Sequence, residues 1–167
     1  MAFFDFIKAA GEKLFPAGGA ATAPQSSGAG QSAADKSAAA DAAAGDAILN
    51  YIKSQNLDAT ALTVTYDSGT EVVTVYGVAK DQATKEKIIL CCGNVANVSR
   101  VDDKMSVEQS GPEAKFYTVK SGDTLSQISK DAYGDANQYP KIFEANRPML
   151  KSPDKIYPGQ VLRIPEA

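Results

Sequence analysis

Few side chains in this protein could carry out chemistry, and their types exclude most catalytic mechanisms. The 167 residues include no histidine, and the two cysteines, Cys91 and Cys92, are neighbours in the sequence. Without histidine, the Ser-His-Asp and Cys-His nucleophile systems, His-bound zinc and imidazole acid–base catalysis are excluded. The sequence therefore indicates a binding or sensing protein rather than an enzyme.

The adjacent cysteines end an apolar run, Ile88–Cys92, and two interpretations of them stay open. Neighbouring residues are poorly placed for a disulfide, because the bond requires a specific Cα spacing and side-chain direction. Free cysteine behaves as a small hydrophobic residue, so the run favours two buried thiols. The alternative is a redox or soft-metal pair, which lacks the two-residue spacer of a C-x-x-C site.

Asp102 and Asp103 form an acidic pair that could attract a divalent cation. The pair lacks the spaced third and fourth oxygen ligands of an EF-hand loop. We therefore expect it at the solvated edge of a strand, where charges also prevent aggregation. The charged stretch Lys85–Lys87 is expected to be a solvated helix face.

Charge and apolar patterning restrict the partners and the location. Lys and Arg number 17 and Asp and Glu number 20, a net charge of −3, which excludes general nucleic-acid binding. Asp5 and Lys8 interrupt the apolar start and no basic region precedes it, so it does not resemble a signal peptide. No stretch approaches the roughly 20 apolar residues of a membrane span. We expect a cytoplasmic protein without stable membrane insertion.

Residues 1–15 are expected to form a short amphipathic helix. Its apolar residues follow helical spacing and are Phe3, Phe6, Ile7, Ala10 and Leu14. A helix this short is marginal alone, so we expect it to dock on its own protein; a partner or a membrane surface is the alternative. Residues 16–45 are rich in Ala, Gly and Ser and predict a flexible linker, whose end from Ala33 has some helical propensity.

Residues 46–109 predict the order α-β-β-α-β. Leu62–Tyr66 and Val72–Tyr76 alternate in polarity around a turn, as paired strands do, and Val98–Val107 is the last strand. Asp46 and Asp81 are candidate N-caps of the two helices. Gly93 is the expected residue after the second helix.

Residues 116–167, after a short linker at 110–115, predict the order β-α-α-β. The expected elements lie at residues 116–120, 125–132, 136–146 and 161–165. Asp123 or Ser121 is the candidate N-cap of the first of these helices.

The last segment is similar to a LysM domain. The similarity rests on Tyr117–Leu125, Ile128–Ser129, Tyr133–Gly134, Ile142–Asn146, Ile156–Gln160 and Leu162–Pro165. Residues 46–109 resemble a BON domain through their order of elements and the Val75–Ala79 stretch. With the N-terminal helix, the arrangement resembles small cytoplasmic BON–LysM proteins that bind potassium. The resemblance implies an α+β fold of two small domains, BON (αββαβ) and then LysM (βααβ), with the short N-terminal helix docked on the BON domain.

The resemblance also implies a potassium-binding and sensing protein that becomes more compact when the ion binds. K⁺ exchanges its water readily for neutral carbonyl oxygens, whereas carboxylate-rich cages favour divalent ions. Two segments, Ile7–Glu12 and Gly93–Val98, offer such carbonyls near the negative ends of helices. Our hypothesis is a cage of main-chain oxygens from Ile7, Ala10, Glu12, Gly93, Val95 and Val98. Ordinary caps satisfied by water are the alternative.

We expect a monomer that takes K⁺, with Rb⁺ and Cs⁺ as candidate substitutes. LysM domains usually bind N-acetylglucosamine polymers such as peptidoglycan or chitin, so a glycan-binding adaptor is the alternative function. Its groove would lie between two loops and comprise Gly122, Asp123, Thr124, Leu125, Ile156, Tyr157, Pro158 and Gly159. A structural role as caps and turns is the other interpretation of these residues. An unknown protein partner could also use the LysM surface.

Overall fold

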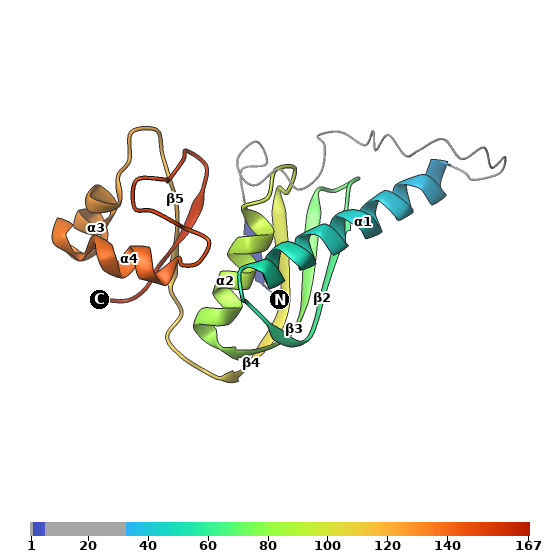
Figure 1. Ribbon diagram of the computed structural model, residues 1–167, viewed down its shortest axis with the longest axis horizontal. Coiled ribbons are helices and arrows are strands. Elements are labelled where there is room, and N and C mark those ends of the chain that lie inside the picture. The colour runs from blue at the N-terminus through green and yellow to red at the C-terminus, as the bar shows by residue number, and fades with distance from the viewer. Residues whose placement is uncertain (1, 6–32) are drawn as a thin grey trace.

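Residues 2–5 and 33–167 are described by a computed structural model, in which helices and strands form two units (Figure 1). The first unit comprises β1 (Ala2–Asp5), α1 (Ala33–Ser54), β2 (Ala59–Asp67), β3 (Val72–Asp81), α2 (Gln82–Gly93) and β4 (Arg100–Gln109). The second comprises β5 (Lys115–Thr118), α3 (Leu125–Tyr133), the 3-10 helix η1 (Ala136–Gln138), α4 (Tyr139–Ala145) and β6 (Val161–Ile164). The α+β fold class expected from the sequence is confirmed.

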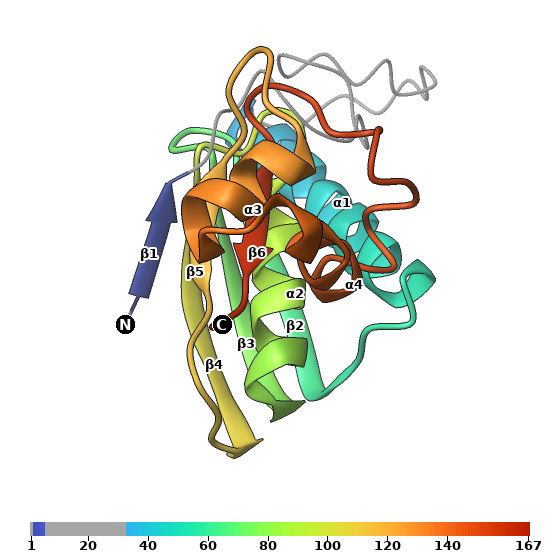
Figure 2. The same cartoon turned by 90° about the vertical axis from the view of Figure 1, so that its left-hand side faces the viewer.

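The first unit is built on a four-stranded sheet in the order β1-β4-β3-β2. Strands β2 and β3 form an antiparallel hairpin, whereas α2 connects β3 to β4 and these two run parallel. Val73 and Val75 of β3 are fully buried, and Thr74 between them is only half-buried. This alternation places the valines under α1 and α2, which both cover the same face of the sheet (Figure 2).

Residues 2–5 form a strand, so the expected N-terminal helix is wrong at these positions. Strand β1 pairs antiparallel with β4, with Phe4 opposite Val101, and the Phe4 ring meets the Phe116 ring edge-on at 5.0 Å. Aromatic residues fit a half-buried strand well, and β4 offers an edge on which four residues can pair. An isolated short helix has no comparable source of stability. Residues 6–15 of the expected helix lie outside the described residues.

Helix α1 begins at Ala33, inside the segment that the sequence assigned to the linker. Asp46 therefore lies within the helix and is not its N-cap. The high helical propensity of alanine extends the helix, and the fully buried Ile48 and Ile52 hold its second half on the sheet.

Two further cap assignments are corrected. Gly93 is the last residue of α2, and Asn94 after it caps the helix with φ −83°, so no left-handed glycine ends the helix. Thr124, rather than Asp123 or Ser121, is the N-cap of α3. A side chain one position closer to the helix makes the capping hydrogen bond, because the Asp123 carboxylate bonds elsewhere.

Asp102 and Asp103 are buried, which corrects their expected place at a solvated edge. Pairing with β1 makes β4 an interior strand, so these residues are only 9% and 6% exposed. The Nζ atom of Lys85 lies 2.9 Å from the Asp103 carboxylate, and that of Lys104 lies 3.5 Å from the Asp102 carboxylate. Each carboxylate is thus paired with a lysine rather than solvated, Asp103 with a residue of α2 and Asp102 with a residue of its own strand.

Asp81 caps α2 as the sequence predicts. Its carboxylate accepts a hydrogen bond from the Thr84 N–H at 2.7 Å, and this bond holds the pKa of Asp81 below its ordinary value. We expect Asp81→Ala to lower the free energy of unfolding at neutral pH by about 1 kcal/mol, measured in urea. Asp81→Asn, which keeps an oxygen acceptor, should lose much less.

The same bond makes the cap dependent on pH. Because the folded protein lowers the pKa of Asp81, the stabilisation is present above the ordinary carboxyl value of 3.8 and is lost as the pH falls below it. The stabilities of the parent chain and of Asp81→Ala should therefore converge in acid. An equal difference at neutral and acid pH would contradict a role for the ionised carboxylate.

Candidate functional site

The turn that follows α2 holds three of the six carbonyls in the candidate potassium cage, those of Gly93, Val95 and Val98. All three residues are buried, and the two valine side chains belong to the core of the first unit. The N–H of Val98 donates to the carbonyl of Val95 at 3.2 Å, which closes the turn. Because glycine and valine have no polar side-chain groups, these three residues can offer an ion only main-chain atoms.

Tyr66 holds this turn from the sheet side. Its hydroxyl donates to the carbonyl of Asn97 at 2.9 Å. Asn97 has φ 74°, a left-handed conformation that asparagine tolerates better than most residues. Burial raises the pKa of Tyr66, which keeps the hydroxyl protonated and able to donate. Helix α2, the core and Tyr66 thus all support the conformation of the turn.

The register of β1 relates this turn to the N-terminal half of the candidate cage. Asp5, the last residue of β1, lies opposite Arg100, which is two positions beyond Val98. The Asp5 carboxylate also accepts a bond from Arg100 Nε at 2.9 Å. Strand β1 therefore ends at the end of the sheet where the turn lies. Ile7, Ala10 and Glu12 lie outside the described residues, so their part in the cage stays a prediction.

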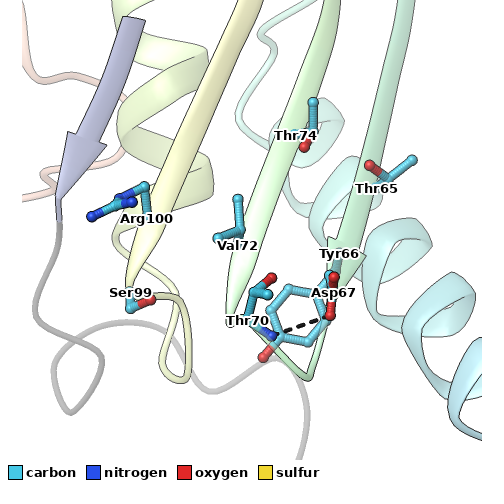
Figure 3. A pocket seen from close by; sticks show the side chains of 8 residues that line it. All are labelled: Thr65, Tyr66, Asp67, Thr70, Val72, Thr74, Ser99 and Arg100. Atoms are coloured by element: carbon cyan, nitrogen blue, oxygen red, sulfur yellow. Dashed lines mark hydrogen bonds between the residues drawn. The ribbon is translucent and has the colours of Figure 1, made fainter.

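A pocket of about 460 Å³ opens beside the same end of the sheet. It lies on the face turned away from the helices (Figure 3). Polar and apolar atoms contribute about equally to its lining, which comprises Thr65, Tyr66, Asp67, Thr70, Val72, Thr74, Ser99 and Arg100. The candidate carbonyl residues are not among them. The pocket is therefore distinct from the candidate cage, although Tyr66 both lines the pocket and bonds to Asn97 in the turn.

The 156–159 loop of the candidate glycan groove is anchored to the segment that leads into the other loop. The N–H of Val119 donates to the carbonyl of Gln160, and its carbonyl accepts from the N–H of Gly159, both at 2.8 Å. Val119 lies three positions before Gly122, the first residue of the second loop. A groove between the two loops stays a prediction.

Several residues of this groove also have structural roles. Asp123 accepts bonds from the Lys120 N–H at 2.9 Å and the Tyr117 hydroxyl at 2.8 Å, and these two bonds lower the pKa of Asp123. Thr124 caps α3, and the Leu125 side chain is buried in the core of the second unit. A ligand here would have to be recognised largely by main-chain groups.

Cys91 and Cys92 are free, buried thiols, as the apolar run predicts. Burial raises the pKa of both thiols, which suppresses the reactive thiolate. Within residues 2–5 and 33–167, no three His, Cys, Asp or Glu side chains form a group that could hold a metal. Of the helices in this part of the chain, none combines the length and apolar character that a membrane crossing requires.

Sequence reasoning missed the roles of two residues, Asn94 within the candidate turn and Glu86 in the helix that precedes it. The side chain of Asn94 bonds to the main chain of Val161 in β6, and Glu86 is 3% exposed rather than part of a solvated helix face. The available signal was the unbroken apolar run at Ile88–Cys92. A helix that is apolar on all sides must be covered on all sides, so α2 needed a second packing partner besides the sheet.

Comparisons with known proteins agree with this architecture. A BON domain model matches residues 40–109, and a LysM domain model matches residues 117–165. A protein of Deinococcus radiodurans described as uncharacterized is 53% identical over 49 residues, 29% of this chain and 19% of that protein. An endolysin of Bacillus phage B103 is 31% identical over 90 residues, 54% of this chain and 31% of that protein.

A further relative aligns along the whole chain. It is the potassium binding protein Kbp of Escherichia coli O6:H1 (strain CFT073), which is 44% identical over 167 residues covering 99% of each protein. Together with the two domain matches, this alignment shows that the chain belongs to the BON–LysM family that includes the potassium binding protein Kbp.

Proposed function

We propose that this protein is a cytoplasmic, monomeric potassium sensor that binds K⁺ and becomes more compact on doing so. The observation that carries the proposal is the alignment over 99% of both chains with a protein named for potassium binding. The absence of histidine and the two domain matches support a binding protein rather than an enzyme.

The proposed ligands are the main-chain oxygens of Ile7, Ala10, Glu12, Gly93, Val95 and Val98. Gly93 ends α2, where the last carbonyls lack later helical N–H partners and the helix dipole is negative. Neutral carbonyl oxygens suit a large monovalent ion, and Rb⁺ and Cs⁺ would share this preference over smaller cations. The packing of Val95 and Val98 in the core lowers the cost of organising the site.

Compaction follows from the two sources of the ligands. Segments 7–12 and 93–98 are far apart in sequence, and the ion would join them across the end of the sheet where β1 and β4 meet. An ion that binds only the joined form shifts the population of the protein towards it.

The test is a thermal melt of ion-free protein in KCl, NaCl and CsCl at matched ionic strength. At about 100 times its dissociation constant, a ligand adds about 2.7 kcal/mol, which corresponds to a shift of several degrees. We expect a large shift with K⁺ and little with Na⁺. Equal shifts in all salts would indicate charge screening and contradict the proposal.

Removal of residues 6–15 tests the cage itself, because it deletes three proposed ligands and leaves β1 in the chain. The K⁺-specific shift should disappear, while the circular dichroism spectrum in NaCl stays that of the full chain. Glu12→Gln is the matched control and should retain the shift, because only its main-chain oxygen is proposed as a ligand. A shift that survives the deletion would show that the ion binds elsewhere.

The second candidate function is binding of N-acetylglucosamine polymers by the LysM domain. The backbone pair between Val119 and Gly159–Gln160 favours it, because this pair anchors the 156–159 loop beside the segment that leads into the 122–125 loop. Titration with chitin oligomers and muropeptides tests it. Saturable binding that is lost when the 156–159 loop is altered would support a glycan adaptor.

A further inference from the structure

The side chain of Asn94 joins the candidate ion site to the LysM domain. Its amide nitrogen donates to the carbonyl of Val161 at 2.8 Å, and its amide oxygen accepts from the N–H of Val161 at 2.9 Å. This reciprocal pair imitates the contact between two strands. Val161 begins β6 and is 4% exposed, and its side chain packs in the core of the BON domain.

A second contact sets the relative position of α2 and β6. The buried Glu86 carboxylate accepts bonds from Arg163 Nε and from the N–H of Ala114. Glu86 and Asn94 are eight positions apart and therefore lie on one side of α2, whereas Val161 and Arg163 are two apart and lie on one face of β6. The contacts of Asn94 with Val161 and of Glu86 with Arg163 thus set how α2 and β6 lie against each other.

Asn94 stands between two proposed ion ligands, Gly93 and Val95. The Asn94 side chain reaches Val161 only while the turn keeps the conformation that also sets the direction of the neighbouring carbonyls. Docking of the LysM domain and the geometry of the ion site therefore depend on the same few backbone torsions. Coupling between two binding events is reciprocal, so whichever event favours this conformation also favours the other.

We propose that Asn94 is a positioning residue that couples the ion site to the docking of the LysM domain. Ion binding strengthens the contact between α2 and β6, and loss of the Asn94 contact weakens ion binding. This inference rests on the proposed potassium function and adds to it the route by which the ion acts on the second domain.

The experiment measures the affinity of the full chain for KCl by calorimetric titration. We expect Asn94→Ala to weaken binding by about fivefold or more, the lower end of typical coupling between sites. Asn94→Gln, which keeps an amide, should bind more tightly than the alanine variant. Asp81→Ala is the matched control: it destabilises the same helix at its other end and should leave the affinity within about twofold, since its cap does not contact the turn.

A second readout is the radius of gyration from small-angle X-ray scattering in K⁺ and in Na⁺. The parent chain and Asp81→Ala should contract in K⁺, and Asn94→Ala should contract less. If the parent chain binds no K⁺, the proposed function fails. If the parent chain binds K⁺ and Asn94→Ala matches it in affinity and contraction, the proposed function stands and the coupling is wrong. Equal weakening by Asn94→Ala and Asp81→Ala would also overturn the coupling, since it would reflect stability alone.

Discussion

Arg163→Met should lower the free energy of unfolding by about 3–5 kcal/mol, because it leaves a buried carboxylate without its charged partner. Glu86 and Arg163 form an ion pair whose side chains are only 4% and 11% exposed. Methionine preserves much of the volume of the arginine stem but offers no donor. Equilibrium unfolding in urea, followed by circular dichroism, measures the loss.

Two variants establish the cause. Arg147→Met removes an arginine from an ion pair with Glu144 whose side chains are 58% and 63% exposed, and it should cost less than about 1 kcal/mol. Adding Glu86→Gln to Arg163→Met removes the uncompensated charge and keeps an acceptor for the N–H of Ala114, so it should recover much of the loss. If Arg163→Met and Arg147→Met lower the free energy of unfolding by similar amounts, the burial of the Glu86–Arg163 pair is not the cause of the loss.

Gly77→Ala should lower the free energy of unfolding by about 3 kcal/mol or more, because it combines backbone strain with a steric clash. Gly77 has φ 143°, and a Cβ atom there would lie 3.1 Å from the carbonyl oxygen of Thr60 and 3.2 Å from the Cα atom of Leu62. Both are main-chain atoms of β2, at the point where the register between β2 and β3 shifts. Neither can move without disturbing the hairpin.

Gly122→Ala is the matched control for Gly77→Ala. Gly122 also has a positive φ, of 88°, but an added Cβ would meet nothing within 4 Å. Backbone strain alone should cost about 1–2 kcal/mol, measured in the same urea titration. If the two alanine variants lose equal stability, the close approach of β2 to Gly77 contributes nothing to the loss in Gly77→Ala.

Local patterns in the sequence predicted most elements of the fold. Alternating polarity identified β2 and β3, and the Asp81 side chain identified the start of α2. The N-terminal strand could not be predicted this way, because the spacing of Phe3, Phe6 and Ile7 also fits a helix. What decides the structure of residues 2–5 is the free edge of β4, nearly one hundred positions away.

The candidate site was harder to predict from the sequence, because it too depends on features that no local pattern of residues reveals. Main-chain carbonyls leave no trace in residue type, so the cage was inferred from helix ends and from a resemblance. The roles of Asn94 and Glu86 depend on β6, which follows them by some seventy residues. A polar residue that bonds to a distant element looks the same in sequence as one that faces solvent.

Strand β1 precedes the other strands of the sheet in the sequence, but its neighbour in the sheet is β4, the last of them. Ala2 lies opposite Asp103. At about 5–20 residues per second, a ribosome needs about 5–20 s to make the roughly 100 residues between them. Throughout that time residues 2–5 lack the strand with which they pair in the folded protein. The strand that is made before the other three therefore joins the sheet only after the last of them has been made.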